Sequence, residues 1–110
     1  MKVIRDSEEN TVEVAPGRGR RVAHTDNLMA VVWDFADGPA GEPDPYHSHP
    51  HEQVTYVAEG EVQFFIGEES SRLQPGDMVI VPPGEPHTIQ TLSPRVRLVD
   101  TFTPLRSEFL

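Results

Sequence analysis

Short apolar runs separated by Pro and Gly make up most of the chain. Eleven prolines and eight glycines interrupt the sequence, and the segments between them are rich in Val, Ile, Phe and Thr. This pattern is typical of an all-β sandwich or barrel, because each run is long enough for one strand only. No window shows a 3.6-residue apolar period, so little or no helix is expected. The expected strands are 12–14, 28–36, 53–58, 61–66, 78–82, 87–92 and 96–102.

Alternation within two runs predicts which side chains face the interior, because successive strand residues point to opposite faces. In 28–36, the odd-numbered residues from Met29 to Phe35 share one apolar face. In 96–102, Asp100 falls on the same face as Leu98 and Phe102. The sequence therefore predicts an inward-pointing carboxylate among apolar neighbours.

Two turns and a tail are also predicted. Glu59-Gly60 lies between two strand runs and is interpreted as a hairpin turn. Gln74-Pro75-Gly76-Asp77 has Pro at the second and Gly at the third position of a β-turn. The last residues, Thr103 to Leu110, form a short tail able to fold back over a barrel.

Length and charge narrow the class of protein. A chain of 110 residues predicts a single domain, 1–110, with one modest core. No apolar run approaches the roughly 20 residues of a membrane span, and the start lacks the apolar core of a secretory signal, so a cytoplasmic protein without membrane contact is expected. The net charge of −9 disfavours nucleic acid as a partner. The basic cluster Arg18, Arg20 and Arg21 is interpreted as a solvated loop.

Histidines are concentrated in one segment. His47, His49 and His51 account for three of the five histidines, and Gln53 follows them at the same spacing. Side chains at i and i+2 of a strand lie roughly 6–7 Å apart on one face, close enough to share one ion. His87 opens a later run. Solvated imidazoles are the simpler alternative, and the number of coinciding spacings disfavours it.

The spacing of these residues resembles the two motifs of the cupin superfamily. The resemblance implies a small antiparallel β-barrel of the jelly-roll type, with His47, His49, Gln53 and His87 as ligands of one divalent transition metal. Gln53 stands where the motif has Glu, and Thr91 where it has Asn. The matching positions of the first motif are Gly41, His47, His49, Gln53 and Gly60, and those of the second are Gly76, Pro82, Gly84, His87 and Thr91.

Gln53 changes the chemistry expected of this site. Three imidazoles and an amide are neutral, so the ion would keep its full charge and act as a strong Lewis acid. The site also lacks the carboxylate of the two-His-one-carboxylate iron centres. Zinc, nickel or manganese is therefore expected rather than iron. His51 remains open: it is either a further donor near the metal or a residue at the barrel mouth that contacts substrate or solvent, because Pro50 interrupts the ladder.

The end of the chain carries a narrower resemblance. HPHEQ, the Glu59-Gly60 pair and Asp-x-Phe-x-x-x-Arg before a terminal Phe-Leu resemble small cupins of pectin and alginate breakdown, which convert 4,5-unsaturated uronates to linear keto-uronates. The resemblance implies Asp100 as general acid and base, Arg106 as a carboxylate clamp and Phe102 as an apolar wall. Taken alone, Asp100 is more often a structural acceptor and Arg106 a solvated tail residue.

Three further functions stay open at this stage. The same short architecture resembles zinc polyketide cyclases, and cupins also include dioxygenases and non-enzymatic binding or sensing proteins. For any of them the expected partner is a small molecule, anionic in the case of a uronate. A homodimer is expected because a small barrel leaves sheet edges to cover.

Overall fold

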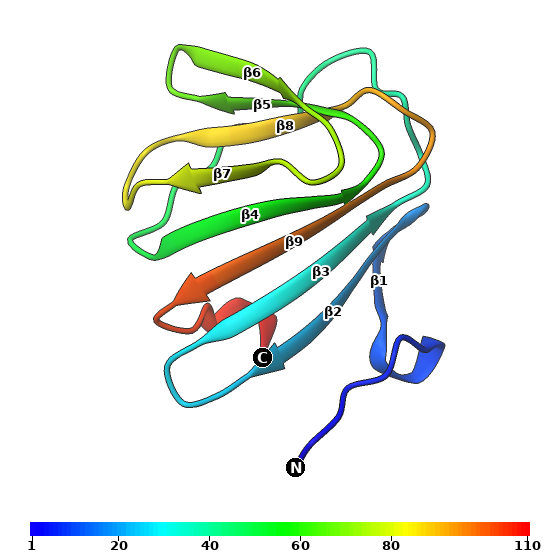
Figure 1. The fold of residues 1–110 in the computed structure, drawn as a ribbon, viewed down its shortest axis with the longest axis vertical. Helices are drawn as coiled ribbons and strands as arrows, with labels where there is room; N and C mark the ends of the chain where they lie inside the picture. The colour runs from blue at the N-terminus through cyan, green and yellow to red at the C-terminus, as the bar shows by residue number, and fades with distance from the viewer.

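A computed structural model of residues 1–110 shows nine strands in two antiparallel sheets (Figure 1). The larger sheet has the order β1-β2-β3-β9-β4-β7, and the smaller one β6-β5-β8. Two short 3-10 turns, Glu8–Asn10 and Ser107–Phe109, are the only helical elements. The strands are β1 Val12–Ala15, β2 Arg18–His24, β3 Met29–Phe35, β4 Glu52–Glu59, β5 Val62–Ile66, β6 Glu69–Leu73, β7 Met78–Val81, β8 His87–Thr91 and β9 Val96–Thr103.

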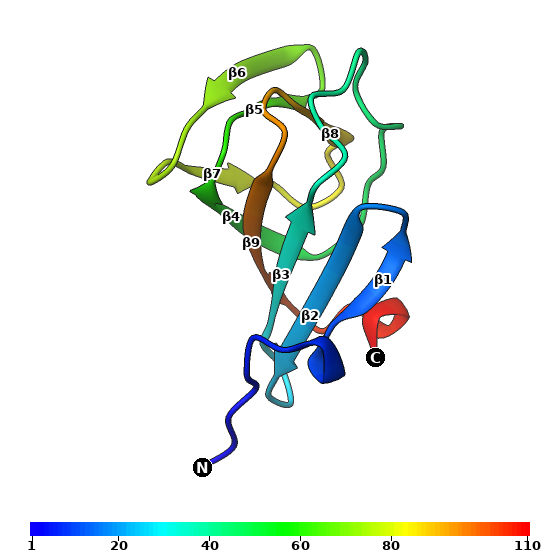
Figure 2. The same ribbon diagram turned by 90° about the vertical axis from the view of Figure 1, so that its right-hand side faces the viewer.

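The two sheets pack at one end of the molecule. Figures 1 and 2 show β5, β6 and β8 at the end that also contains β4 and β7, whereas β1, β2 and β3 extend towards both termini. The expected all-β jelly roll with almost no helix is confirmed, although the sheets do not close into a strict barrel. None of the helical elements is long and apolar enough to cross a membrane.

Two strands lie where the sequence pattern does not predict them. The sequence of β2, RGRRVAH, and that of β6, ESSRL, contain too few apolar residues to show alternation. Pairing creates them: β2 aligns with β3 from Arg18 opposite Phe35 to His24 opposite Met29, and β6 aligns with β5. The interpretation of the arginine cluster as a solvated loop is therefore wrong, because a neighbouring strand outweighs local preference.

The Glu59-Gly60 segment is not a hairpin. β4 pairs with β7 and β9, whereas β5 pairs with β6 and β8, so this turn carries the chain from one sheet to the other. The turn at Gln74–Asp77 is confirmed: the Asp77 N–H donates to the Gln74 carbonyl oxygen at 3.0 Å, and Gly76 has φ +97°.

Gly60 is required at the sheet-to-sheet turn. Its φ is +76°, and a Cβ atom there would clash with the carbonyl oxygen of Arg95. We expect Gly60→Ala to lower the free energy of unfolding by roughly 2–3 kcal/mol, since strain and overlap act together. Gly67 is the matched control, because its φ is +57° and nothing lies within 4 Å of an added Cβ. Urea unfolding should show a clearly smaller loss of stability for Gly67→Ala. Equal losses in the two variants would show that the Arg95 carbonyl oxygen does not exclude a side chain at position 60.

The interior is divided into two apolar clusters on either side of Asp100. Leu98 belongs to the larger cluster, and Phe102 to the smaller one with Met29 and Val31. Asp100 lies between Leu98 and Phe102 on the inward face of β9, as the alternation predicts. The larger cluster is Phe35, Val57, Val62, Phe64, Leu73, Val81, Val96 and Leu98.

Candidate metal centre and adjoining cavity

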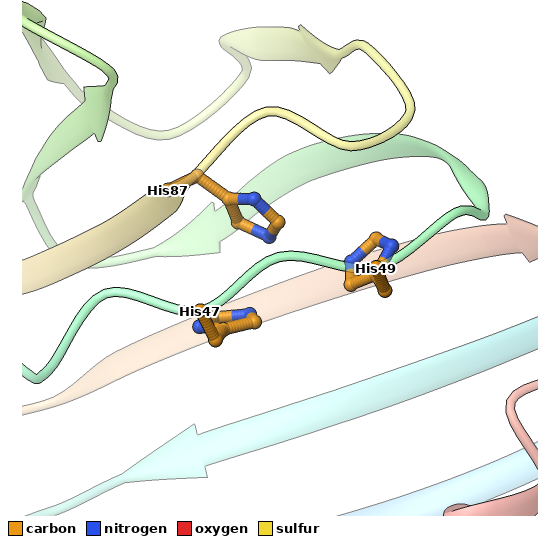
Figure 3. A group of neighbouring side chains, drawn as sticks. All are labelled: His47, His49 and His87. Carbon is orange, nitrogen blue, oxygen red and sulfur yellow. The ribbon is translucent and has the colours of Figure 1, made fainter.

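Three of the histidines meet near the start of β8. His47 forms an isolated bridge with His87: each backbone N–H donates to the other residue's carbonyl oxygen, at 3.0 and 2.9 Å. The ring centroids of His47 and His49 lie 4.2 and 4.9 Å from that of His87. One ring nitrogen from each histidine lies within 4.8 Å of the others, and Figure 3 shows the three rings grouped together.

The histidine segment itself is irregular rather than a continuous strand. β4 begins only at Glu52, because Pro50 lacks an N–H and cannot continue a ladder. The carbonyl oxygen of His49 accepts a hydrogen bond from the Gly84 N–H at 2.8 Å. The Pro-Gly turn before β8 therefore holds the histidine segment against the strand that carries His87.

The hydrogen bonds of the histidines determine which ring nitrogen carries the proton and which keeps a lone pair. Nδ1 of His87 lies 2.8 Å from the Glu85 carbonyl oxygen, which only accepts, so Nδ1 carries the proton and Nε2 keeps a lone pair. That Nε2 and Nδ1 of His49 are buried without a partner. Desolvation lowers the pKa of His49 and His87, and together with the neighbouring His87 it lowers the pKa of His47 to about 4.

These features fit a bound metal ion. Neutral imidazoles with free lone pairs are the state that coordinates a cation, and a buried nitrogen without a partner costs free energy that coordination would recover. The observed group contains the three predicted histidine ligands His47, His49 and His87.

Gln53, the second residue of β4, lies beside this group. Its side chain is buried, and its Oε1 lies 2.9 Å from Nε2 of His49. Its amide nitrogen donates to the Thr55 hydroxyl oxygen at 2.9 Å, which holds Oε1 towards the histidines. Because an amide oxygen only accepts, Nε2 of His49 donates to it, which leaves the lone pair of this imidazole on Nδ1.

A hydrogen-bonded chain connects the histidines to Asp100. The Thr55 hydroxyl, which accepts from Gln53, donates to Oδ1 of Asp100 at 2.6 Å. Desolvation raises the pKa of Asp100 to about 6, although the hydrogen bond from Thr55, the neighbouring Trp33 and the charge of Arg106 act in the opposite direction. A half-buried carboxyl with a raised pKa is characteristic of a functional site.

Arg106 reaches the site from the C-terminal tail, which folds back over the sheet. Its guanidinium stacks over the rings of Phe102 and Phe109, at 5.2 and 4.5 Å from their centroids. It also pairs with Glu108 at 2.6 Å, and its side chain is only 15% exposed. A cation held in this way contributes to lowering the pKa of all three histidines.

One cavity joins these groups. It has a volume of about 340 Å³ and its wall includes two of the clustered histidines together with Gln53, Asp100 and Arg106. Trp33, Phe35, Phe64, Ile89 and Leu98 supply apolar wall. The size and the mixture of apolar wall with few polar groups are typical of a small-molecule site.

Three sequence-predicted residues lie outside this wall: His49, which is grouped with the other two clustered histidines, Phe102 and His51. Phe102 is fully buried, with its ring 5.6 Å from that of His49, so its position favours packing behind the histidines rather than the substrate contact implied by the resemblance. His51 is not one of the three histidines whose ring nitrogens lie within 4.8 Å of one another, although its ring centroid is 5.3 Å from that of His49. Its Nε2 lies 3.0 Å from the Leu105 carbonyl oxygen, so the ring ties the tail to the segment before β4.

Sequence reasoning missed three residues of the wall. The alternation places Trp33 only on an apolar face, although it lines the cavity together with Asp100. Arg18 and Asp44 line the same cavity. Nothing local distinguishes either of them, because their proximity depends on how β2 and the loop before His47 are placed.

Comparison with known proteins agrees with this geometry. Residues 35–102 match the family described as Cupin domain. The chain belongs to the cupin family. This cupin is 36% identical over 107 residues to the pectin degradation protein KdgF of Dickeya dadantii, across 96% of the chain and 94% of that protein. The resemblance to the cupins of pectin breakdown is thereby confirmed.

Two further similarities define how far the likeness extends. The structure of KdgF from Halomonas sp. superposes with a TM-score of 0.86 at 34% identity, covering 100% of this cupin and 99% of that chain. Dimethylsulfoniopropionate lyase DddQ of Ruegeria pomeroyi is 43% identical over 68 residues, which is 61% of this cupin but only 32% of the lyase. The likeness to the KdgF proteins thus covers the whole chain, whereas that to the lyase is local.

Proposed function

We propose that this cupin binds one divalent transition metal and converts a 4,5-unsaturated uronate monosaccharide to its linear keto form. The observation that carries the proposal is one cavity whose wall contains two of the three clustered histidines together with Gln53, Asp100 and Arg106. The similarity to a pectin degradation protein over 96% of the chain supports a sugar acid as substrate.

The chemistry divides between a metal ion and the protein's own residues. His47, His49, His87 and Gln53 would hold the ion, which supplies Lewis acidity when bound because all four donors are neutral. Arg106 binds the substrate carboxylate, since a guanidinium offers paired N–H donors in a planar fork. Zinc, nickel and manganese suit this donor set, and iron suits it less without a carboxylate ligand.

Asp100 moves the protons that the reaction requires. The overall change is an isomerisation: the hemiacetal hydroxyl loses a proton, the ring C–O bond at that carbon breaks, and the alkene carbon C4 gains a proton. One carboxylate that first accepts and then donates a proton balances these steps. The pKa of about 6 suits both roles near neutral pH, and the apolar walls, including Phe64 and Leu98, limit access of water.

The experiment that tests this function uses purified metal-loaded protein and unsaturated galacturonate. We expect the alkene absorbance to fall faster than in buffer alone, with the linear keto-uronate appearing by NMR. Boiled protein and protein treated with a chelator serve as controls. A rate equal to the spontaneous ring opening, on unsaturated galacturonate and on the mannuronate-derived substrate alike, would overturn the proposal.

The cavity favours this function over the alternatives. A volume of about 340 Å³ suits a monosaccharide better than a poly-β-ketone chain, which disfavours a polyketide cyclase. The histidine group contains no carboxylate, which disfavours an iron dioxygenase. The main alternative is a cupin that binds a small molecule without converting it. Replacing Asp100 distinguishes the two functions, because simple binding does not require a proton carrier.

We also propose that the chain forms a homodimer through the outer face of β4 and β7. Val54 lies opposite Ile80 and Tyr56 opposite Met78, and all four are exposed, Ile80 at 74%. β7 is an edge of the larger sheet. A second copy of the chain suits the surface formed by these four residues, since an exposed, largely apolar surface is complementary to an identical one.

Light scattering coupled to gel filtration tests the dimer. We expect the wild-type chain to elute at twice its monomer mass and Ile80→Glu to elute as a monomer, because the substitution buries a charge in the interface. Val12→Glu is the matched control: Val12 is 55% exposed on β1, at the opposite edge of the same sheet. A monomeric wild type, or equal disruption by both variants, would contradict this interface.

A further inference from the structure

An ion pair with no role in the proposed chemistry lines the same cavity. Arg18 at the start of β2 donates to both carboxylate oxygens of Asp44, from Nη1 at 2.8 Å and from Nη2 at 3.1 Å. Both residues belong to the cavity wall. Their side chains keep 23% and 33% of their surface exposed, so the pair remains accessible from solvent or ligand.

The hydrogen bonds of this pair leave donors and acceptors free. A guanidinium has five N–H donors, and Arg18 uses one towards Asp37 and two towards Asp44. Each carboxylate oxygen can accept more than one hydrogen bond, and each oxygen of Asp44 accepts one from Arg18. The pair therefore presents free N–H groups beside free lone pairs, which is the combination that a hydroxyl group, both donor and acceptor, requires.

The remainder of the wall provides few partners for hydroxyl groups. Beyond the metal-binding residues, Asp100 and Arg106, the wall is mostly apolar. Thr88 already donates its hydroxyl proton to the Asp44 carbonyl oxygen at 2.8 Å, and Trp33 offers a single indole N–H. A ring hydroxyl buried in this cavity without a partner would weaken binding.

We propose that the Arg18–Asp44 pair binds ring hydroxyl groups of the substrate and selects hydroxylated sugar acids over deoxygenated ones. This inference rests on the proposed function for the identity of the substrate. It makes the pair a specificity-determining element, whereas Arg106 recognises the carboxylate. Sites built to hydrogen-bond a hydroxyl discriminate strongly against analogues that lack it, because the protein's own polar groups are then left unpaired.

The Asp44 side chain can be changed without releasing its backbone. Its N–H donates to the Ile89 carbonyl oxygen at 2.9 Å and its carbonyl oxygen accepts from Thr88. Both bonds are independent of the carboxylate, so Asp44→Asn keeps the loop in place. Asp37 is a matched control, since it also pairs with Arg18, at 2.8 Å from Nε, but does not line the cavity.

The test compares metal-loaded wild type, Asp44→Asn and Asp37→Asn on unsaturated galacturonate and its 3-deoxy analogue. We expect wild type to prefer the hydroxylated substrate by at least about 100-fold in kcat/KM. Asp44→Asn should reduce this preference to about tenfold or less, mainly by raising KM for galacturonate. Asp37→Asn should keep it. An unchanged preference in Asp44→Asn, or an equal loss in Asp37→Asn, would overturn the inference.

A binding measurement separates this inference from the proposed function. Calorimetric titration with saturated galacturonate and with cyclohexanecarboxylate requires no turnover. A wild-type preference for galacturonate that Asp44→Asn removes supports the hydroxyl-binding pair even if unsaturated uronates are not converted, in which case only the proposed function fails. Equal affinities for the two acids in wild type would overturn the inference directly.

Discussion

Replacing Asp100 by Asn is expected to lower kcat by roughly 10²–10⁴-fold, because the reaction loses the group that accepts and returns protons. The substitution conserves shape, and an amide oxygen can still accept the hydrogen bond that Thr55 donates at 2.6 Å. KM should change less, since Arg106 and the metal-binding residues remain. Initial rates of metal-loaded protein on unsaturated galacturonate measure the effect.

The same variant should not lose stability at neutral pH. Burial raises the pKa of Asp100 from 3.8 to about 6, so the folded state disfavours the ionised carboxylate. With the folded pKa above the unfolded one, stability is highest when the group is protonated and declines as pH rises from about 4 to 6. At pH 7 the ionised Asp100 lowers the free energy of unfolding by on the order of 3 kcal/mol. Asn carries no charge and removes this loss, although its N–H₂ group needs a hydrogen-bond partner.

Urea unfolding of metal-free protein at two pH values checks this expectation. At pH 7.5 we expect Asp100→Asn to be as stable as wild type or more stable, and at pH 4 the advantage should disappear. Asp34→Asn is the control, because Asp34 pairs with Arg97 at 2.6 Å outside the cavity wall and should leave kcat unchanged. Unchanged turnover together with a clear loss of stability in Asp100→Asn would assign the carboxylate a structural role.

Removing one of the proposed histidine ligands is expected to have a second large effect, on metal affinity and on kcat/KM. His47→Ala should weaken metal binding by at least about 100-fold and lower kcat/KM by about 10³-fold or more, because the site loses a donor and the ion's Lewis acidity. His47 is exposed and its bridge to His87 uses backbone atoms only, so the fold should persist. Elemental analysis after dialysis and titration against a competing chelator measure the loss.

His51→Ala is the matched control within the same segment. His51 contacts the Leu105 carbonyl oxygen and lies outside the clustered histidines, so its loss should leave the metal content at one ion per chain. Full metal content in His47→Ala would show that the ligand assignment is wrong. Equal metal loss in both variants would show that His51 also coordinates the ion.

Much of the candidate site could be predicted because the patterns that indicate it lie within short segments of the chain. Strand alternation has a period of two, so the neighbours of Asp100 in 96–102 are enough to predict that its side chain points inward. The histidine spacings and the Pro-Gly turn before His87 identified the cupin motifs without any knowledge of contacts. The hairpin at Glu59-Gly60 was wrong for the opposite reason: whether two consecutive strands pair depends on the partners that each finds elsewhere, here β7, β9, β6 and β8.

The sequence by itself determined the β-rich architecture, the neutral character of the residues proposed to hold a metal ion, and the inward carboxylate. Only the tertiary structure decided that these groups share one cavity and that Arg18 meets Asp44 there. The contacts concerned join residues far apart in the chain: 45 positions separate Thr55 from Asp100, and 26 separate Arg18 from Asp44. Such contacts arise from sheet pairing and packing, which outweigh local preferences, so no short-range pattern encodes them.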